Sequence, residues 1–306
     1  MRSQSLHTQL THAGIEQATT NRKSAYGPGR GRPTPTATLD SVPAIRRPTT
    51  SDADHRVRAR AGVPQLRRRS IIAVWAAAAI PMGLLSWVAA PLLADQLSGS
   101  GRLARALIVA MTAGLVWQFA LVMILVRREQ GTLRWSVLRD ALWLCAPRSP
   151  RSGRRGGRVW LAVVPLCLAF AVMQLVPSLP HPASRDLGKF LESHTGHAFL
   201  GGSWGWFAVL AVMFILNTVL GEELLFRGYL LPRMNGAFGR RDWLANGVLF
   251  GAYHVHMPWA IPASIFDGFI FAYPSKRYRS ALIGIAVHSA QSVVFIGLTL
   301  SLVLKG

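Results

Sequence analysis

Two adjacent glutamates and a nearby arginine are the residues of this sequence best suited to chemistry. Glu222, Glu223 and Arg227 follow an apolar run, residues 204–220, that contains no charge and reads as a membrane helix ending at the glutamates. A carboxylate at membrane depth costs roughly 2.5–3.5 kcal/mol on insertion scales, so it needs a partner and usually has a function. The adjacent pair therefore predicts a reaction site.

Two histidines in later apolar segments could complete that site. His254 and His288 lie in separate apolar runs. A carboxylate in a dry site can accept a proton from water, and a histidine could polarise that water, bind a metal with the carboxylate, or stabilise an oxyanion. Together these groups predict activation of water for attack on a carbonyl carbon.

Simpler interpretations of the same residues remain open. Glu223 and Arg227, four residues apart, could form only an ion pair at the end of a helix. His254 and His288 could each be a hydrogen-bond donor between helices. His256 would lie about 200° around a helix from His254, so we expect it to face elsewhere and to be structural.

The signatures of several other enzyme classes are missing from the sequence. It contains no His-Glu-x-x-His zinc helix, no Gly-x-Ser-x-Gly elbow and no phosphate-binding loop. Its two cysteines, Cys145 and Cys167, predict neither a structural disulfide nor a cysteine metal site.

The composition predicts a multi-pass protein of the plasma membrane. Of the 306 residues, 51% are hydrophobic and only 15% are charged, which is too apolar for a typical soluble protein. The net charge of +21 comes from basic clusters between apolar runs, a pattern typical of cytoplasmic loops facing anionic lipid headgroups. A nucleic-acid partner is therefore disfavoured.

We expect membrane helices to position the glutamates and histidines. The sequence predicts an all-α transmembrane bundle of about seven spans, with eight as the alternative. The fifth and sixth runs fall short of the roughly 20 residues that a crossing needs, as expected for helices lining a polar cavity. The apolar runs are 71–94, 106–126, 159–177, 204–222, 243–257, 260–274 and 281–304.

The charge of the connections predicts the topology. Segments 127–158, 227–242 and 275–279 are rich in Arg and Lys, whereas the alternate connections are poor in them. This asymmetry places the N-terminus in the cytoplasm and the C-terminus outside. An amphipathic stretch, 133–144, is expected on the cytoplasmic surface. Since the glutamates lie at the cytoplasmic end of their span, we expect their cavity to open on that side.

Three regions are predicted along the chain. Residues 1–70 hold thirteen Lys and Arg against four acids and few large apolar residues, so we expect a disordered cytoplasmic tail whose Arg67, Arg68 and Arg69 contact anionic headgroups. Residues 71–203 would form the N-terminal helices and a basic loop. Residues 204–306 would form the catalytic membrane core.

The motifs resemble one known family, the CAAX-protease and bacteriocin-processing intramembrane proteases, also called the Abi or type II CAAX prenyl endopeptidase family. That family carries Glu-Glu-x-x-x-Arg, then Phe-x-x-x-His, then a histidine followed four residues later by Asn or Asp. The first two motifs match fully, whereas Ser replaces the amide or acid of the third. The matching positions are Glu222, Glu223, Arg227, Phe250, His254, His288 and Ser292.

The resemblance implies a role for each matched residue. Glu222 would be the base that activates water, with His254 as its partner. Glu223 and Arg227 would shape and neutralise the site, and His288 would help to bind substrate or stabilise the oxyanion. The family has been described as metalloproteases, which implies a divalent metal such as Zn²⁺ held by Glu222, His254 and His288.

The departure at Ser292 keeps a second class of function open. The leading hypothesis is an intramembrane endopeptidase that cleaves a membrane-associated or lipid-anchored peptide, in CAAX-type processing or in bacteriocin processing or immunity. The alternative is a non-catalytic membrane scaffold of the same fold that regulates a partner protein. A transporter using the acids as a proton relay is disfavoured, because no internal repeat is detectable. Asp267, in the sixth apolar run, could pack between helices or relay protons, and its spacing does not tie it to the other residues.

Overall fold

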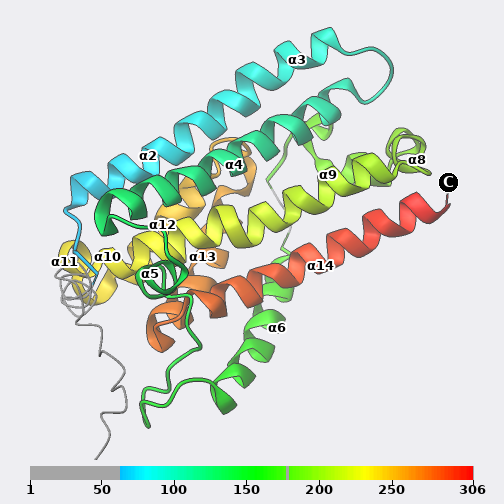
Figure 1. Cartoon of the computed structure of the whole chain (residues 1–306). Helices are drawn as coiled ribbons and strands as arrows, with labels where there is room; N and C mark the ends of the chain where they lie inside the picture. The colour runs from blue at the N-terminus through cyan, green and yellow to red at the C-terminus, as the bar shows by residue number, and fades with distance from the viewer. Residues whose placement is uncertain (1–62, 177–178, 306) are drawn as a thin grey trace, which may run out of the picture. The chain divides into compact units, whose positions relative to one another are not determined.

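The structure is a computed structural model that describes residues 63–176 and 179–305. In this part of the chain the regular elements are all helices, joined by turns and irregular connections, and there are no strands (Figure 1). The predicted all-α class is confirmed. The tail was predicted over residues 1–70, and its residues 1–62 lie outside the described part of the chain. The helical segments are α2 (Arg68–Leu84), η1 (Leu85–Ala89), α3 (Ala90–Gln96), α4 (Arg102–Gln130), α5 (Trp135–Ala141), η2 (Gly157–Ala162), α6 (Val163–Met173), η3 (Ala183–Arg185), α7 (Leu187–Glu192), α8 (His194–Leu200), α9 (Trp204–Ile215), η4 (Leu216–Gly221), η5 (Leu224–Leu230), α10 (Leu231–Arg233), α11 (Asn235–Phe238), η6 (Gly239–Arg241), α12 (Asp242–Tyr253), η7 (Pro258–Ala260), α13 (Ile261–Tyr278) and α14 (Ala281–Lys305).

Four helices in the described part of the chain are long and apolar enough to cross a membrane. They are Arg68–Gln96, Arg102–Gln130, Trp204–Arg233 and Ala281–Lys305. The other three predicted spans correspond to α6, α12 and α13, which do not meet these criteria of length and composition. The bundle therefore combines four long helices with three shorter ones.

Three indole side chains form hydrogen bonds between the first long helix and its neighbours. Pro81 lies inside α2 and has no N–H to donate to the carbonyl oxygen of Ala77. The indole of Trp117 on α4 donates to that oxygen instead, at 2.8 Å. The indole of Trp75 donates to the carbonyl oxygen of Leu249 inside α12, and the indole of Trp87 donates to that of Val255 just beyond the end of α12, each at 2.8 Å. These bonds join the first long helix to α12 and to the turn that follows it.

Helices α12 and α13 form a close hairpin because glycines line their contact. A Cβ atom built on Gly268 would lie 2.7 Å from the carbonyl oxygen of Gly247, so a side chain would force the helices apart. Gly247 and Gly251 are four residues apart on one face of α12, the small-residue spacing that lets membrane helices approach closely. This hairpin carries His254 at its turn.

The third long helix, Trp204–Arg233, runs past the glutamates instead of ending at them. The sequence predicted a span ending at 222, but the helix continues for eleven more residues. Every residue from Gly221 to Met234 is buried, and the charged side chains in this stretch find partners within the protein. A helix whose charges are paired internally need not end where they begin.

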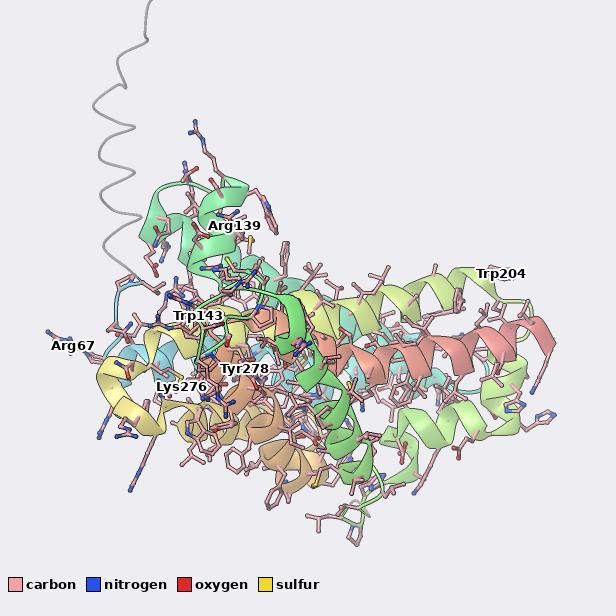
Figure 2. The ribbon with its side chains drawn as sticks, turned by 90° about the horizontal axis from the view of Figure 1, so that it is seen from below. Arg67, Arg139, Trp143, Trp204, Lys276 and Tyr278 are labelled. Atoms are coloured by element: carbon pink, nitrogen blue, oxygen red, sulfur yellow. The ribbon has the colours of Figure 1, made fainter. Side chains whose placement is uncertain are left out.

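The basic connections gather at one end of the bundle, which we call the basic end. Figure 2 shows Arg67, Arg139, Trp143, Lys276 and Tyr278 toward this end and Trp204 at the other. The loop after α5 is fastened to the turn between α13 and α14, since the amide of residue 148 donates to the carbonyl of residue 278 and the amide of residue 281 to that of residue 143. The clustering agrees with the predicted charge asymmetry.

Candidate active site

The two glutamates lie between two π-helical segments of the third long helix. Segment η4 ends at Gly221 and η5 begins at Leu224, and the amide of Glu222 donates to the carbonyl of Asn217, five residues earlier. Wide turns of this kind are rare in helices and frequent at functional sites. Glu222 and Glu223 are 3% and 0% exposed, so the helix carries both carboxylates into the protein interior.

Glu223 is held between an arginine and a histidine. Its Oε1 lies 2.9 Å from Nη1 of Arg227 and 3.2 Å from Nδ1 of His288 on α14. The same guanidinium donates from Nη2 to the carbonyl oxygen of Gly268 at 3.2 Å. The predicted pairing of Glu223 with Arg227 therefore forms, but in the interior instead of at a helix end.

Aromatic rings enclose this ion pair. The guanidinium carbon of Arg227 lies 4.1 Å from the ring centre of Phe250 and 5.1 Å from that of Phe271, which is close enough for cation–π attraction. The ring of Phe271 also stacks on His288, with centres 4.7 Å apart. Phe250 thus supports the charged cluster directly, beyond filling space in the core.

Glu222 faces His254 across a gap wider than a hydrogen bond. Oε1 of Glu222 and Nε2 of His254 are 4.0 Å apart. Nδ1 of His254 lies 3.0 Å from the carbonyl oxygen of Phe250, which can only accept, so Nδ1 donates. In neutral histidine Nε2 then keeps its lone pair. Two acceptors at this separation suit a bridging water that donates one O–H to each.

The structure brings six of the seven predicted site residues together and turns the seventh away. Ser292 lies on α14, but its hydroxyl donates to the carbonyl oxygen of Phe214 and lies 3.0 Å from the hydroxyl of Thr218, so it is bound to the early part of the third long helix. Ser292 thus joins two helices and makes no hydrogen bond to either glutamate.

His256 is a neighbour of the site that sequence reasoning placed elsewhere. The prediction assumed a helix through residue 257, whereas α12 ends at Tyr253. Beyond the helix the chain turns, and the His256 ring stacks on the His254 ring with centres 5.4 Å apart. Pro258 was the available signal, because the backbone before a proline avoids the helical region.

Gly284 and Ser275 also belong to the site, and sequence patterns did not reveal them. A Cβ atom built on Gly284 would meet Oε2 of Glu223 and would lie 2.9 Å from Oγ of Ser275. Both oxygens are buried and have no hydrogen-bond partner within the described residues. The missing side chain at position 284 therefore makes the space that the carboxylate of Glu223 occupies.

A cavity of about 410 Å³ adjoins this cluster on the side away from the basic end. Asn217, His256 and Ser292 line it, together with the segment around Arg185 and the first half of α4. A second pocket, of about 1420 Å³, lies at the basic end and is lined by Trp143, Pro232 and Arg279 among others. The opening of the glutamate site on that side stays a prediction.

The predicted metal ligands Glu222, His254 and His288 have different neighbours in this structure. Among residues 63–176 and 179–305 there is no group of three His, Cys, Asp or Glu side chains arranged to hold a metal ion. His288 contacts Glu223, whereas His254 faces Glu222. The two histidines thus serve different carboxylates instead of converging on one ion.

Comparison with known proteins supports the resemblance found in the motifs. The model of the family described as type II CAAX prenyl endopeptidase Rce1-like matches residues 204–294, which confirms the resemblance for this part of the chain. An uncharacterized protein of Bacillus subtilis (strain 168), YyaK, is 27% identical over 158 residues, 47% of this chain and 48% of the relative. The chain thus spans about half the length of this relative. No solved structure matches.

Proposed function

We propose, from the match of residues 204–294 to the type II CAAX prenyl endopeptidase Rce1-like family, that this chain is an intramembrane endopeptidase in which Glu222 and His254 activate water. The observation that carries the proposal is the facing pair of acceptors, Oε1 of Glu222 and Nε2 of His254, 4.0 Å apart in a buried site. This is the geometry needed to orient one water for attack.

The reaction then needs only proton transfers by the chain's own groups. Glu222 accepts one proton of the water while the water oxygen attacks the carbonyl carbon of the peptide bond. The same proton passes to the leaving nitrogen when the C–N bond breaks, which releases an acid and an amine and restores the carboxylate. Nε2 of His254 accepts the second O–H of the water and holds its orientation.

The other matched residues are proposed to position these groups. Glu223, Arg227 and His288 form one paired cluster, which holds the carboxylate of Glu223 beside Glu222 and fixes α14 against the third long helix. Phe250 fixes His254 through its carbonyl oxygen and Arg227 through its ring. We assign substrate contact to Glu222 and His254 and support to the rest.

The substrate is proposed to be a peptide or protein held at the membrane, with or without a lipid anchor. Processing of a CAAX-type C-terminus and processing of, or immunity to, a bacteriocin both meet this description. We also propose that the basic end contacts anionic lipid headgroups, since Arg127, Arg134 and Arg139 lie there and are exposed.

The second candidate is a non-catalytic scaffold that regulates a partner protein. One observation favours it, the engagement of Ser292 with Thr218 and Phe214 in place of a third polar group at the catalytic water. The two candidates differ in whether Glu222 is needed for peptide cleavage or only for the fold.

Cleavage of a membrane-anchored reporter peptide by the full chain in proteoliposomes tests the proposal. We expect Glu222→Gln and His254→Ala each to lower the rate by about 10²–10⁴-fold, the range for loss of a general base or its partner. Asp95→Asn is the matched control, because Asp95 is an exposed acid on α3. Unchanged cleavage by both site variants would favour the scaffold, and a chelator titration with metal add-back tests metal dependence separately.

A further inference from the structure

Gln118 is a polar side chain buried in the middle of a long membrane helix, α4. It is 0% exposed, and the other buried residues of α4 are apolar. Burying a polar group at membrane depth is costly, and groups that are kept there usually have a function. The helix lies outside residues 204–294, which match the protease family, so the family motifs give Gln118 no role.

Gln118 reaches the residue that precedes His254. Its Nε2 donates a hydrogen bond to the hydroxyl of Tyr253, which is the last residue of α12 and is also 0% exposed. The ring of Tyr253 packs edge-on against the ring of His254, with centres 5.3 Å apart. The hydrogen bond from α4 therefore holds the ring against which His254 lies.

The same side chain lies against the residue that precedes Glu222. A Cβ atom built on Gly221 would lie 3.3 Å from Oε1 of Gln118 and 3.1 Å from Cδ2 of Leu115, so this glycine lets α4 approach the glutamate helix closely. Oε1 of Gln118 is buried and has no hydrogen-bond partner within the described residues. Gln118 thus lies beside the backbone neighbours of both groups that are proposed to activate water.

The hydroxyl of Tyr253 keeps one hydrogen to donate. Because Nε2 of Gln118 donates to the phenolic oxygen, the phenolic hydrogen is left for another acceptor, and it makes no hydrogen bond within residues 63–176 and 179–305. The carboxylate of Glu222 is close enough to interact electrostatically with this phenol. A phenol that donates to a carboxylate, directly or through one water, fixes the orientation of that carboxylate.

His254 depends on such contacts because it follows the end of its helix. Beyond Tyr253 the chain leaves the helix, and the amide of Val255 donates to the carbonyl oxygen of Tyr253 at 2.7 Å. The indole of Trp87 donates to the carbonyl oxygen of Val255 at 2.8 Å. Side chains of the first two long helices, Trp87 and Gln118, therefore hold the turn that presents His254 to Glu222.

We propose that Gln118 is a positioning residue of the reaction, which through Tyr253 holds His254 and Glu222 in the arrangement that shares one water. This rests on the proposed function for the reaction, whereas the placement of His254 by Gln118 is a matter of geometry alone. A purely structural role would instead stabilise the fold and leave the rate per folded molecule unchanged.

Three variants of the full chain separate these two roles. Gln118→Met removes the amide and keeps the length of the side chain, Tyr253→Phe removes only the hydroxyl, and the third variant combines both changes. Gln130→Met is the matched control, because Gln130 is the last residue of the same helix and its amide bonds to the neighbouring Glu129. Cleavage of the reporter peptide is measured in proteoliposomes per folded molecule.

We expect kcat to fall about 10–100-fold in all three variants, the range for a catalytic group displaced by up to about 1 Å. KM should not change, because the lost contact positions the reacting groups and does not bind the substrate. The double variant should lose no more than either single variant, since both changes remove the same hydrogen bond. Gln130→Met should keep the wild-type kcat.

Unfolding in mixed detergent micelles identifies a merely structural effect. Each single variant leaves one polar group buried without its partner and should lower the unfolding midpoint, whereas the double variant replaces both partners by apolar groups and should recover it. Recovered stability with a kcat that stays low supports positioning. Recovery of both, an unchanged kcat in the single variants, losses that multiply in the double variant, or a change in KM alone would each overturn the proposal.

Nitrogen NMR of the histidine side chains tests the geometry independently of cleavage. The resonances of His254 are identified by their loss in His254→Ala. We expect Gln118→Met to shift them and Gln130→Met to leave them in place, and unshifted resonances in Gln118→Met contradict the proposal. If the wild-type chain does not cleave the reporter, the proposed function fails, and these resonances still decide whether Gln118 positions His254.

Discussion

Two arginines six residues apart on one helix are both fully buried, and they differ in how well their hydrogen-bonding groups are satisfied. Arg233 makes two 2.8 Å contacts with the carboxylate of Glu129, from Nε and Nη2. Its Nη1 donates to the carbonyl oxygens of Tyr229 at 2.8 Å and Ala141 at 3.1 Å. These hydrogen bonds tie α4, α5 and α10 together, so we interpret Arg233 as structural.

Arg227 is satisfied much less completely. Only its Nη2 makes a hydrogen bond, to Gly268. Nη1 lies 2.9 Å from Glu223 but is not aligned for a hydrogen bond, and Nε has no partner among the described residues. Oε2 of Glu223 is likewise unpartnered. Buried polar groups without hydrogen-bond partners lower the stability of the fold. We therefore interpret the cluster around Arg227 as functional and the fully bonded Arg233 as structural support.

The largest expected difference between the two arginines is in stability. We expect Arg233→Met to lower the free energy of unfolding by about 3–5 kcal/mol, the usual cost of removing one partner of a buried ion pair. Arg227→Met should cost less, because fewer aligned hydrogen bonds are lost, but it should abolish peptide cleavage. Unfolding in mixed detergent micelles measures the first quantity, and the proteoliposome assay measures the second.

A double variant tests whether the stability lost in Arg233→Met comes from leaving the carboxylate of Glu129 buried without its partner. Arg233→Met together with Glu129→Met removes both partners, and a buried ion pair replaced by apolar side chains is often neutral in stability. We therefore expect the double variant to regain most of the stability lost in Arg233→Met. If Arg227→Met proves more destabilising than Arg233→Met, the contrast between the two arginines is wrong.

The next effect concerns the space around the less satisfied cluster. Gly284→Ala would place a methyl group against Oε2 of Glu223 and Oγ of Ser275, so we expect a loss of about 1–3 kcal/mol, typical of overpacking, and lower cleavage activity. Gly297→Ala on the same helix is the control, since nothing lies within 4 Å of its added carbon. Helix propensity should make it neutral or up to about 1 kcal/mol more stable. Equal effects in the two variants would show that Gly284 makes no special room.

The contrast also explains how far the sequence could predict the molecule. Apolar runs located six of the seven helices within four residues of their observed bounds but ended the glutamate helix eleven residues too early. Motif spacing selected Glu222, Glu223, Arg227 and His254 as candidates, because these signals are local. Local spacing could not reveal which oxygen a guanidinium reaches across helices, so the Glu129–Arg233 pair, 104 residues apart, was not predicted. It also gave the wrong face to His256, because a helix was assumed beyond its true end.

The smallest expected effect separates two buried serines near the site. Ser292 is bonded to Phe214 and Thr218, so Ser292→Ala should cost about 1 kcal/mol, the net contribution of a hydrogen bond. Ser275 has no partner for its hydroxyl among the described residues and is 0% exposed, so Ser275→Ala should leave stability unchanged or slightly increase it. Detergent unfolding of the two variants side by side measures the difference. If Ser275→Ala is the more costly change, its hydroxyl bonds to the free oxygen of Glu223 in solution, and the cluster around Arg227 is then as well satisfied as the one around Arg233.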